Sequence, residues 1–181
     1  MADPKKATGD TKDIYQDIYD TLRWYGDASK GRCPGVRLLP HYQPWIIPKA
    51  IDLGCGRGHT VKAIRELGLD CDGIDQVDLG NDMMVGSIMV DLDMSSYNTA
   101  ICIDVIEHLE DDQVEKLFCN MAKVKRQIFA IHNGKGTEKG TVLHVNRKNF
   151  ADWDKVVENH FQVLDKIVEH KRQVLYICNQ K

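Results

Sequence analysis

The feature that most constrains this chain is a short apolar segment that leads directly into a glycine-rich turn. Residues 50–53 (AIDL) are followed by 54–58 (GCGRG) and then by apolar residues at helical spacing over 59–67. Glycine lets the backbone adopt angles that other residues resist, and it lets a ligand come close to the main chain. The helix behind the turn presents free N–H groups and a partial positive charge. This order predicts a ligand site at the carboxyl end of a parallel strand.

Strand and helix patterns alternate along the segment that contains this turn. Alternation predicts βαβ units, and therefore a mostly parallel sheet with helices on both faces. Two apolar stretches that are close in sequence end the chain and predict an antiparallel hairpin. The expected strands are 50–53, 71–74, 83–89, 99–105, 127–131, 161–167 and 173–178, and the expected helices are 59–67, one capped by Asp111 and one around 150–157 that Asn146 could cap.

The length of the chain bounds its domain organisation. It has 181 residues, of which 43% are hydrophobic, and this suits one ordinary domain. Residues 1–11 are polar and without a period, so we expect a mobile tail. Residues 12–48 are expected to cover the core with a helix that stops at Gly26 and a proline-rich connector with at most one short helix. Residues 49–131 form the expected binding core, and 132–181 form a loop, a helix and the hairpin.

Composition excludes several classes of protein. No stretch approaches the roughly 18 apolar residues that a membrane-spanning helix needs. The net charge of −3 and the pI near 6.1 do not favour a protein that binds nucleic acid through its phosphates. The six cysteines form no CxxC pair and show no zinc spacing, so no metal centre is expected. The N-terminal segment lacks an apolar leader, and we expect a cytoplasmic protein in a reducing compartment.

The residues around the turn distinguish between two adenosine-type cofactors. Asp75 stands at the end of the second expected strand, where a carboxylate accepts hydrogen bonds from the two hydroxyls of a ribose. A dinucleotide fingerprint would place a third glycine at position 59, which is His59 here. The carboxylate of Asp52 would repel a pyrophosphate, but it suits the ammonium group of an amino acid. These residues favour a nucleoside with an amino-acid tail, which is S-adenosylmethionine.

Three motifs in this order resemble those of the class I S-adenosylmethionine-dependent methyltransferases, and of their small-molecule members in particular. Residues 51–58 (IDLGCGRG) look like motif I, and 73–75 (GID) resemble the acidic end of the second strand. Residues 99–105 followed by 106–109 (IEHL) are similar to the fourth strand and the segment after it. The resemblance implies a Rossmann-like, doubly wound, mostly parallel seven-stranded sheet with an antiparallel C-terminal hairpin. It also implies methyl transfer from S-adenosylmethionine.

The resemblance assigns roles to residues of the core. The backbone of the glycine turn would wrap the methionine part, Asp52 would lie near its amino group and Asp75 would bind the ribose. Gln76 or Val77 would flank the adenine, and Asp104 would lie beside the sulfonium. The acidic residue that many relatives use against the adenine amino group is replaced by Ser87-Ile88, with Asp91 as the rival if the third strand is longer. The expected cofactor-binding set is Asp52, Gly54, Cys55, Gly56, Gly58, Asp75, Gln76, Ser87, Ile88 and Asp104.

Three histidines are candidate catalytic bases, because a hydroxyl acceptor must lose a proton and histidine titrates near neutral pH. His108 belongs to the IEHL segment, where it acts either as a brace of the loop or as a group on the substrate side. His132 follows the fifth strand, and His144 precedes the helix around 150–157. The aromatic residues of the N-terminal cover have two readings: they pack the cover against the sheet, or they contact the ligands.

The acceptor is expected to be a small molecule that takes the methyl group on oxygen or nitrogen. Residues 104–107 read Asp-Val-Ile-Glu, which is not the Asp/Asn-Pro-Pro-aromatic loop of enzymes that methylate base amino groups in DNA. Two alternatives stay open. One is a methyltransferase that acts on RNA or protein, and the other is a catalytically silent subunit that binds the cofactor within a partner enzyme. The oligomeric state is not predicted.

Overall fold

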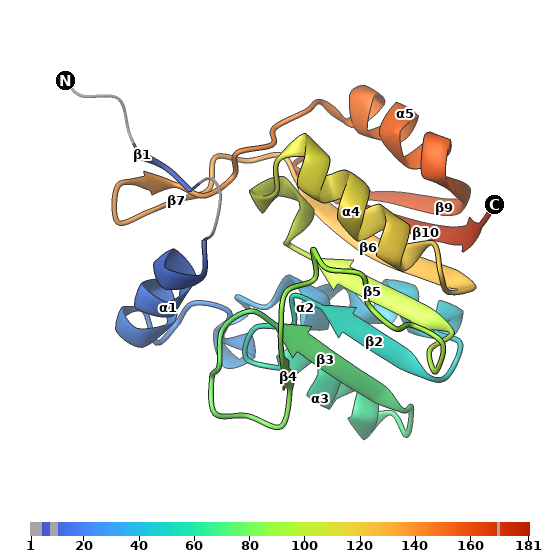
Figure 1. The fold of residues 1–181 in the computed structure, drawn as a ribbon, viewed down its shortest axis with the longest axis horizontal. Coiled ribbons are helices and arrows are strands. Elements are labelled where there is room, and N and C mark those ends of the chain that lie inside the picture. Colours follow the sequence, from blue (N-terminus) through green and yellow to red (C-terminus); the bar gives the residue numbers. More distant parts are fainter. Residues whose placement is uncertain (1–4, 8–10, 170) are drawn as a thin grey trace.

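A seven-stranded sheet forms the centre of the computed structural model, which describes residues 5–7, 11–169 and 171–181 (Figure 1). All neighbouring pairs are parallel except those made by the strand nearest the C-terminus, which runs antiparallel to both of its neighbours. The expected sheet and its closing hairpin are therefore confirmed. Across the sheet the strands are β4 (Met84–Val85), β3 (Cys71–Asp75), β2 (Ala50–Leu53), β5 (Thr99–Ile103), β6 (Arg126–His132), β10 (Gln173–Gln180) and β9 (Phe161–Glu169).

Helices cover both faces of this sheet. On one face α4 (Asp111–Met121) and α5 (Phe150–His160) pack on alternate strand residues such as Phe129, and on the other face α2 (Pro34–Tyr42) and α3 (His59–Glu66) pack on residues such as Ile128. Two apolar cores result because successive strand side chains point to opposite faces. Among the described residues, none of the helices has the length and apolar character that crossing a membrane would need.

The ends of several elements differ from the sequence-based expectation. The helix α1 (Lys12–Thr21) stops before Gly26, and the Tyr19 carbonyl near its end accepts a hydrogen bond from Arg57. The third strand expected over 83–89 is only the two-residue edge strand β4, which pairs with β3 alone. Glu110 rather than Asp111 caps α4, in a capping box with Gln113. Asn149 rather than Asn146 caps α5, while Asn146 donates a hydrogen bond to Asp111.

A small second sheet lies with α1 beyond the carboxyl ends of β2, β3 and β5 (Figure 1). It joins β1 (Lys5–Lys6), β8 (Thr141–Val142) and β7 (Thr137–Glu138). The mobile tail expected over residues 1–11 is therefore wrong for 5–7, where β1 pairs with β8 and Ala7 is buried; residues 1–4 and 8–10 lie outside the described part. The remaining connections contain the short 3-10 helices η1 (Ala28–Lys30), η2 (Gln43–Trp45) and η3 (Ile106–His108).

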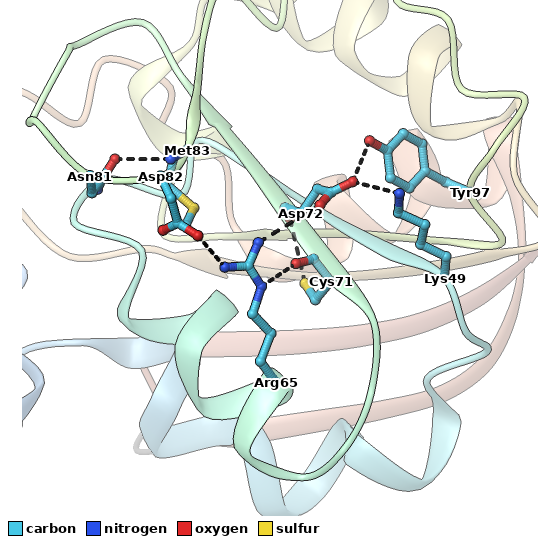
Figure 2. A network of polar contacts seen from close by, with 8 residues as sticks. All are labelled: Lys49, Arg65, Cys71, Asp72, Asn81, Asp82, Met83 and Tyr97. Atoms are coloured by element: carbon cyan, nitrogen blue, oxygen red, sulfur yellow. Dashed lines mark hydrogen bonds and ion pairs between the residues drawn. The ribbon is translucent and has the colours of Figure 1, made fainter.

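A polar network holds the amino-terminal ends of β2 and β3 on the side away from that second sheet (Figure 2). The Asp72 carboxylate accepts a hydrogen bond from the Tyr97 hydroxyl at 2.8 Å and forms an ion pair with Lys49 at 2.8 Å. Arg65 donates to the Cys71 carbonyl at 2.7 Å and pairs with Asp82. The contacts with Lys49, more than those with Tyr97, hold the pKa of Asp72 below its ordinary value.

We expect Asp72→Ala to lower the free energy of unfolding by about 1 kcal/mol, because a partly exposed ion pair and one charged hydrogen bond are lost. The ionised carboxylate is favoured in the folded state, so its contribution is present above the ordinary aspartate pKa and disappears as pH falls through the lower folded-state pKa. Urea unfolding at pH 7 and pH 3 measures this. An equal loss at both pH values, or the same loss in the exposed Asp70→Ala control, would contradict the account.

Candidate cofactor site

A cavity of about 810 Å³ opens where β2, β3 and β5 end. Its wall combines the glycine turn after β2, the residues after β3 and β5, and the N-terminal segment from α1 to the start of α2. Three of the predicted site residues, Gly58, His132 and His144, do not line it. The predicted residues that do line it are Asp52, Gly54, Cys55, Gly56, Asp75, Gln76, Ser87, Ile88, Asp104 and His108.

The glycine turn has a conformation that side chains would disturb. Gly54 and Gly56 have φ of 81° and 51°, in the left-handed region that favours glycine. A Cβ on Gly54 would lie 2.6 Å from a Val105 methyl group, and one on Gly56 would lie 2.6 Å from the Tyr19 hydroxyl. Gly58 instead forms the N-cap of α3, where its φ is 72°, and it packs beside Met83. The turn therefore packs closely against Val105 and Tyr19, and Gly54 and Gly56 line the cavity.

Asp75 is joined to this turn by hydrogen bonds. Its carboxylate accepts from the N–H of Gly56 at 2.8 Å and from the N–H of Val77 at 3.0 Å. Burial raises the pKa of Asp75, although these backbone bonds act in the opposite direction. Burial, together with the nearby Asp75, raises the pKa of Asp52 to about 7. Two aspartates thus lie at one end of the cavity, with little solvent to stabilise a second negative charge.

Aromatic residues of the N-terminal segment also line the cavity. Tyr15 and Tyr19 come from α1, and Trp24 and Tyr25 from the turn that follows it. Arg57 ties this segment to the glycine turn, because its guanidinium donates to the carbonyls of Tyr19 and Tyr25 at 3.0 and 3.1 Å. The sequence left open whether these residues pack the cover or contact a ligand. They do pack, with Tyr19 and Tyr25 at 5.6 Å between ring centroids, and they also form cavity wall.

The residues that follow β4 form a further part of the cavity wall. Ser87 and Ile88 line the wall, whereas Asp91 is 94% exposed and pairs with Lys123 on α4. Leu109 and Gln113 also line the cavity and were not predicted. Both belong to the segment from η3 into α4, and no local sequence signal marks them as wall residues.

Asp104 and His108 approach the cavity from the end of β5. Asp104 has a φ of 65°, an uncommon backbone conformation for a residue other than glycine. His108 accepts a hydrogen bond on Nδ1 from the Tyr15 hydroxyl at 2.6 Å, and it also bonds the backbone of Leu143. Burial lowers the pKa of His108 to about 4, so the ring is neutral at pH 7. The contact with Tyr15 is one that a brace of the loop would make, and His108 also lines the cavity.

The other two candidate bases form a separate cluster with Glu107, behind the cavity. His132 donates its backbone N–H to Glu107 Oε1 at 2.9 Å, and the His132 and His144 ring centroids are 5.4 Å apart. The His108 ring separates this cluster from the cavity and lies 4.6 Å from that of His144. The sequence named the three histidines on separate grounds, and the structure brings their rings together, with His108 alone of the three at the cavity wall.

Comparison with known proteins gives likeness in structure without close likeness in sequence. No protein-family model and no curated protein sequence matches the chain. One similar structure is a 1,6-didemethyltoxoflavin-N1-methyltransferase from Burkholderia thailandensis with bound 1,6-didemethyltoxoflavin and S-adenosylhomocysteine. Its sequence is 13% identical, the match covers 98% of this chain and 94% of that chain, and the TM-score is 0.67. A magnesium protoporphyrin IX methyltransferase from Synechocystis with bound S-adenosylmethionine is 16% identical in sequence. This match covers 98% of this chain and 100% of that chain, with a TM-score of 0.65.

A third solved structure extends this likeness to a further organism. A TehB-like S-adenosylmethionine-dependent methyltransferase from Corynebacterium glutamicum has 19% identity over 93% of this chain and 100% of that chain, with a TM-score of 0.63. The three structures share the mostly parallel, Rossmann-like arrangement over nearly the whole chain. The chain has the fold of the class I S-adenosylmethionine-dependent methyltransferases.

Proposed function

We propose that this protein binds S-adenosylmethionine and transfers its methyl group to an oxygen or nitrogen of a small molecule. The observation that carries the proposal is the hydrogen bond between the glycine turn after β2 and the aspartate at the end of β3. The Gly56 N–H donates to the buried Asp75 carboxylate at 2.8 Å, at the wall of an 810 Å³ cavity. This hydrogen bond joins the glycine turn to a carboxylate suited to a ribose. The fold around it is shared with the methyltransferases named above.

The cavity residues fit this cofactor chemically. Gly54 lets the Val105 side chain pack directly against the turn, and the main chain of the turn at the cavity wall would hold the methionine part. Asp75 would take the ribose hydroxyls, and Asp52 would face the ammonium group. Arg32 lines the cavity next to the Cys33–Gly35 segment, which packs on Thr60 in the first turn of α3, and would take the carboxylate. Gln76, Ser87 and Ile88 would surround the adenine.

The protein's own contribution to the reaction would be positioning and exclusion of water. When bound, the cofactor supplies an electrophilic methyl group on a cationic sulfonium. The Asp104 carboxylate would attract that cation from the end of β5. Tyr15, whose hydroxyl is fixed by neutral His108, would close the same region with Tyr25. Aromatic side chains there remove solvent from the reacting centre and hold an acceptor in line.

A small acceptor suits the way the N-terminal segment encloses the cavity. Tyr15, Tyr19, Trp24 and Tyr25 all line it, and Arg57 holds their backbone in place. Two of the similar structures are named for small-molecule substrates, 1,6-didemethyltoxoflavin and magnesium protoporphyrin IX. We infer an acceptor that fits under this cover rather than a folded macromolecule. The compartment that we expect is the cytoplasm.

Incubation with S-adenosylmethionine that carries a labelled methyl group tests the proposal. The acceptors are a panel of small hydroxyl and amine compounds, with total RNA and a protein lysate as separate arms. Label in a small-molecule product supports the proposal, and label confined to RNA or protein replaces it with the macromolecular alternative. Tight cofactor binding with no label in any arm favours a silent subunit.

We expect affinity for S-adenosylhomocysteine to rise by up to about tenfold between pH 6 and pH 8. Burial raises the pKa of free Asp52 to about 7, whereas a bound ammonium favours the ionised carboxylate. At pH 6 most of the free protein must release this proton on binding, and at pH 8 little of it must. Calorimetry in two buffers of different ionisation enthalpy measures the released proton. A wild-type pH profile parallel to that of Asp52→Asn would show that Asp52 does not face the ligand.

A further inference from the structure

We propose that Glu107, His132 and His144 bind a divalent transition-metal cation, Zn²⁺ in the first place, at a site separate from the cofactor cavity. One potential ligand atom from each residue lies within 4.8 Å of the other two. The residues come from three parts of the chain: Glu107 from η3, His132 from the last position of β6, and His144 from the segment after β8. Tertiary folding, not local sequence, brings them together.

The Glu107 carboxylate supplies the independent sign that a ligand belongs there. Its side chain is 0% exposed, and only Oε1 has a partner, the His132 backbone N–H at 2.9 Å. Oε2 is buried and has no hydrogen-bond partner among the residues that the structure describes. A buried carboxylate oxygen is costly to leave unpaired, and a cation would satisfy it. The nearby Asp104 carboxylate adds to the negative potential around Glu107.

His144 has the orientation of a metal ligand. Its Nδ1 lies 2.8 Å from the Gly134 carbonyl, which can only accept, so Nδ1 carries the proton and Nε2 keeps its lone pair. A hydrogen bond from the second nitrogen to a backbone carbonyl is the usual support of a metal-bound imidazole. A Cβ on Gly136 would lie 2.0 Å from His144 Cδ2, so the ring fits only because that residue is glycine.

His132 couples cation binding to the adjacent loop. The Gly134 N–H donates to His132 Nδ1 at 3.1 Å, which places the proton of the neutral ring on Nε2. A cation at either nitrogen therefore displaces this N–H contact and moves the backbone at Gly134. His132 is only half-buried, and this leaves a route from solvent to the cluster.

The ligand set determines the class of cation. Two imidazole nitrogens and one carboxylate oxygen suit Zn²⁺ and similar first-row cations, whereas Mg²⁺ and Ca²⁺ prefer oxygen ligands. Three protein ligands leave a fourth position of a tetrahedral zinc for water. The bound cation would tie the end of β6 to η3 and to the segment after β8. It would thereby fix the His108 ring, which contacts His144 and faces the cofactor cavity.

Calorimetric titration of Zn²⁺ into chelator-treated protein tests the site. We expect one Zn²⁺ per chain in the wild type, at least about tenfold weaker binding in Glu107→Gln and in His144→Gln, and unchanged binding in His41→Gln, which alters an exposed histidine of α2. No cofactor is added, so the result does not depend on the proposed methyl transfer. Absence of saturable binding, Mg²⁺ binding of equal strength, or equal affinity in all variants would overturn the proposal.

A measurement on the unaltered protein covers the case in which a variant fails to fold. Ring resonances of the histidines, followed by NMR during the same titration, report which rings bind the cation. We expect the shifts to be confined to His132, His144 and the adjoining His108, with His41 unchanged. Shifts in His41 with His132 and His144 unaffected would show adventitious surface binding and would overturn the assignment.

Discussion

Replacement of Asp75 by alanine is expected to weaken binding of S-adenosylhomocysteine by about 100-fold or more. Two charge-assisted hydrogen bonds to ribose hydroxyls would be lost, each worth about 1.5–3 kcal/mol. The same change removes the acceptor of the Gly56 N–H, so the glycine turn also loses one of its supports. Both effects act in the same direction, and the loss is therefore larger than for any other single carboxylate at the site.

The matched control for this prediction is Asp91→Ala. Asp91 is the acid that the sequence offered as an alternative near the adenine, and it is 94% exposed on the surface beside Lys123. Titration calorimetry should give the wild-type affinity for this control. Thermal unfolding of Asp75→Ala separates lost contacts from lost structure. Full affinity in a folded Asp75→Ala protein would refute the ribose assignment.

Gly54→Ala is expected to lower the free energy of unfolding by about 2–4 kcal/mol and to weaken cofactor binding at least tenfold. The added Cβ meets a Val105 methyl group at 2.6 Å, and such overpacking costs about 1–3 kcal/mol. An alanine at a φ of 81° adds about 1–2 kcal/mol of backbone strain. Relief of the collision would move the turn or the Val105 loop, and both adjoin the cavity.

Gly80→Ala separates the collision from the strain. Gly80 also has a positive φ, 66°, but a Cβ there would meet no atom of the described residues within 4 Å. We expect this variant to lose only the strain of about 1–2 kcal/mol and to keep its cofactor affinity. Chemical unfolding and calorimetry of the pair measure both quantities. Equal losses of stability in the two variants would show that close packing at Gly54 is unimportant.

The central sheet could be predicted from the sequence because its signals are local. The segment 99–105 is nearly continuously apolar, and β5 lies within it, paired in parallel on both sides. The glycine turn and Asp75 could be predicted for the same reason, since each follows a strand directly. The parallel sheet then places the ends of β2 and β3 side by side, as the pairing of Leu53 with Ile74 shows.

Other features depend on tertiary contacts that a single sequence does not record. Lys5–Lys6 has no strand pattern, and it becomes β1 only because β8 offers a backbone edge. The contact between His108 and the Tyr15 hydroxyl joins residues that are 93 positions apart in sequence. The cluster of Glu107, His132 and His144 has no metal-binding spacing in the sequence, and it converges only after β6 is placed beside β5.

The most direct test of the central claim is a calorimetric titration of the wild-type protein with S-adenosylhomocysteine and, separately, with NAD. The glycine turn, Asp52 and Asp75 predict saturable binding of S-adenosylhomocysteine with one site per chain and much weaker binding of NAD. His59 stands where a dinucleotide site would need its third glycine, and Asp52 disfavours a pyrophosphate. Tighter binding of NAD, or no binding of S-adenosylhomocysteine, would contradict the assignment of this cavity to a methyl-donor cofactor.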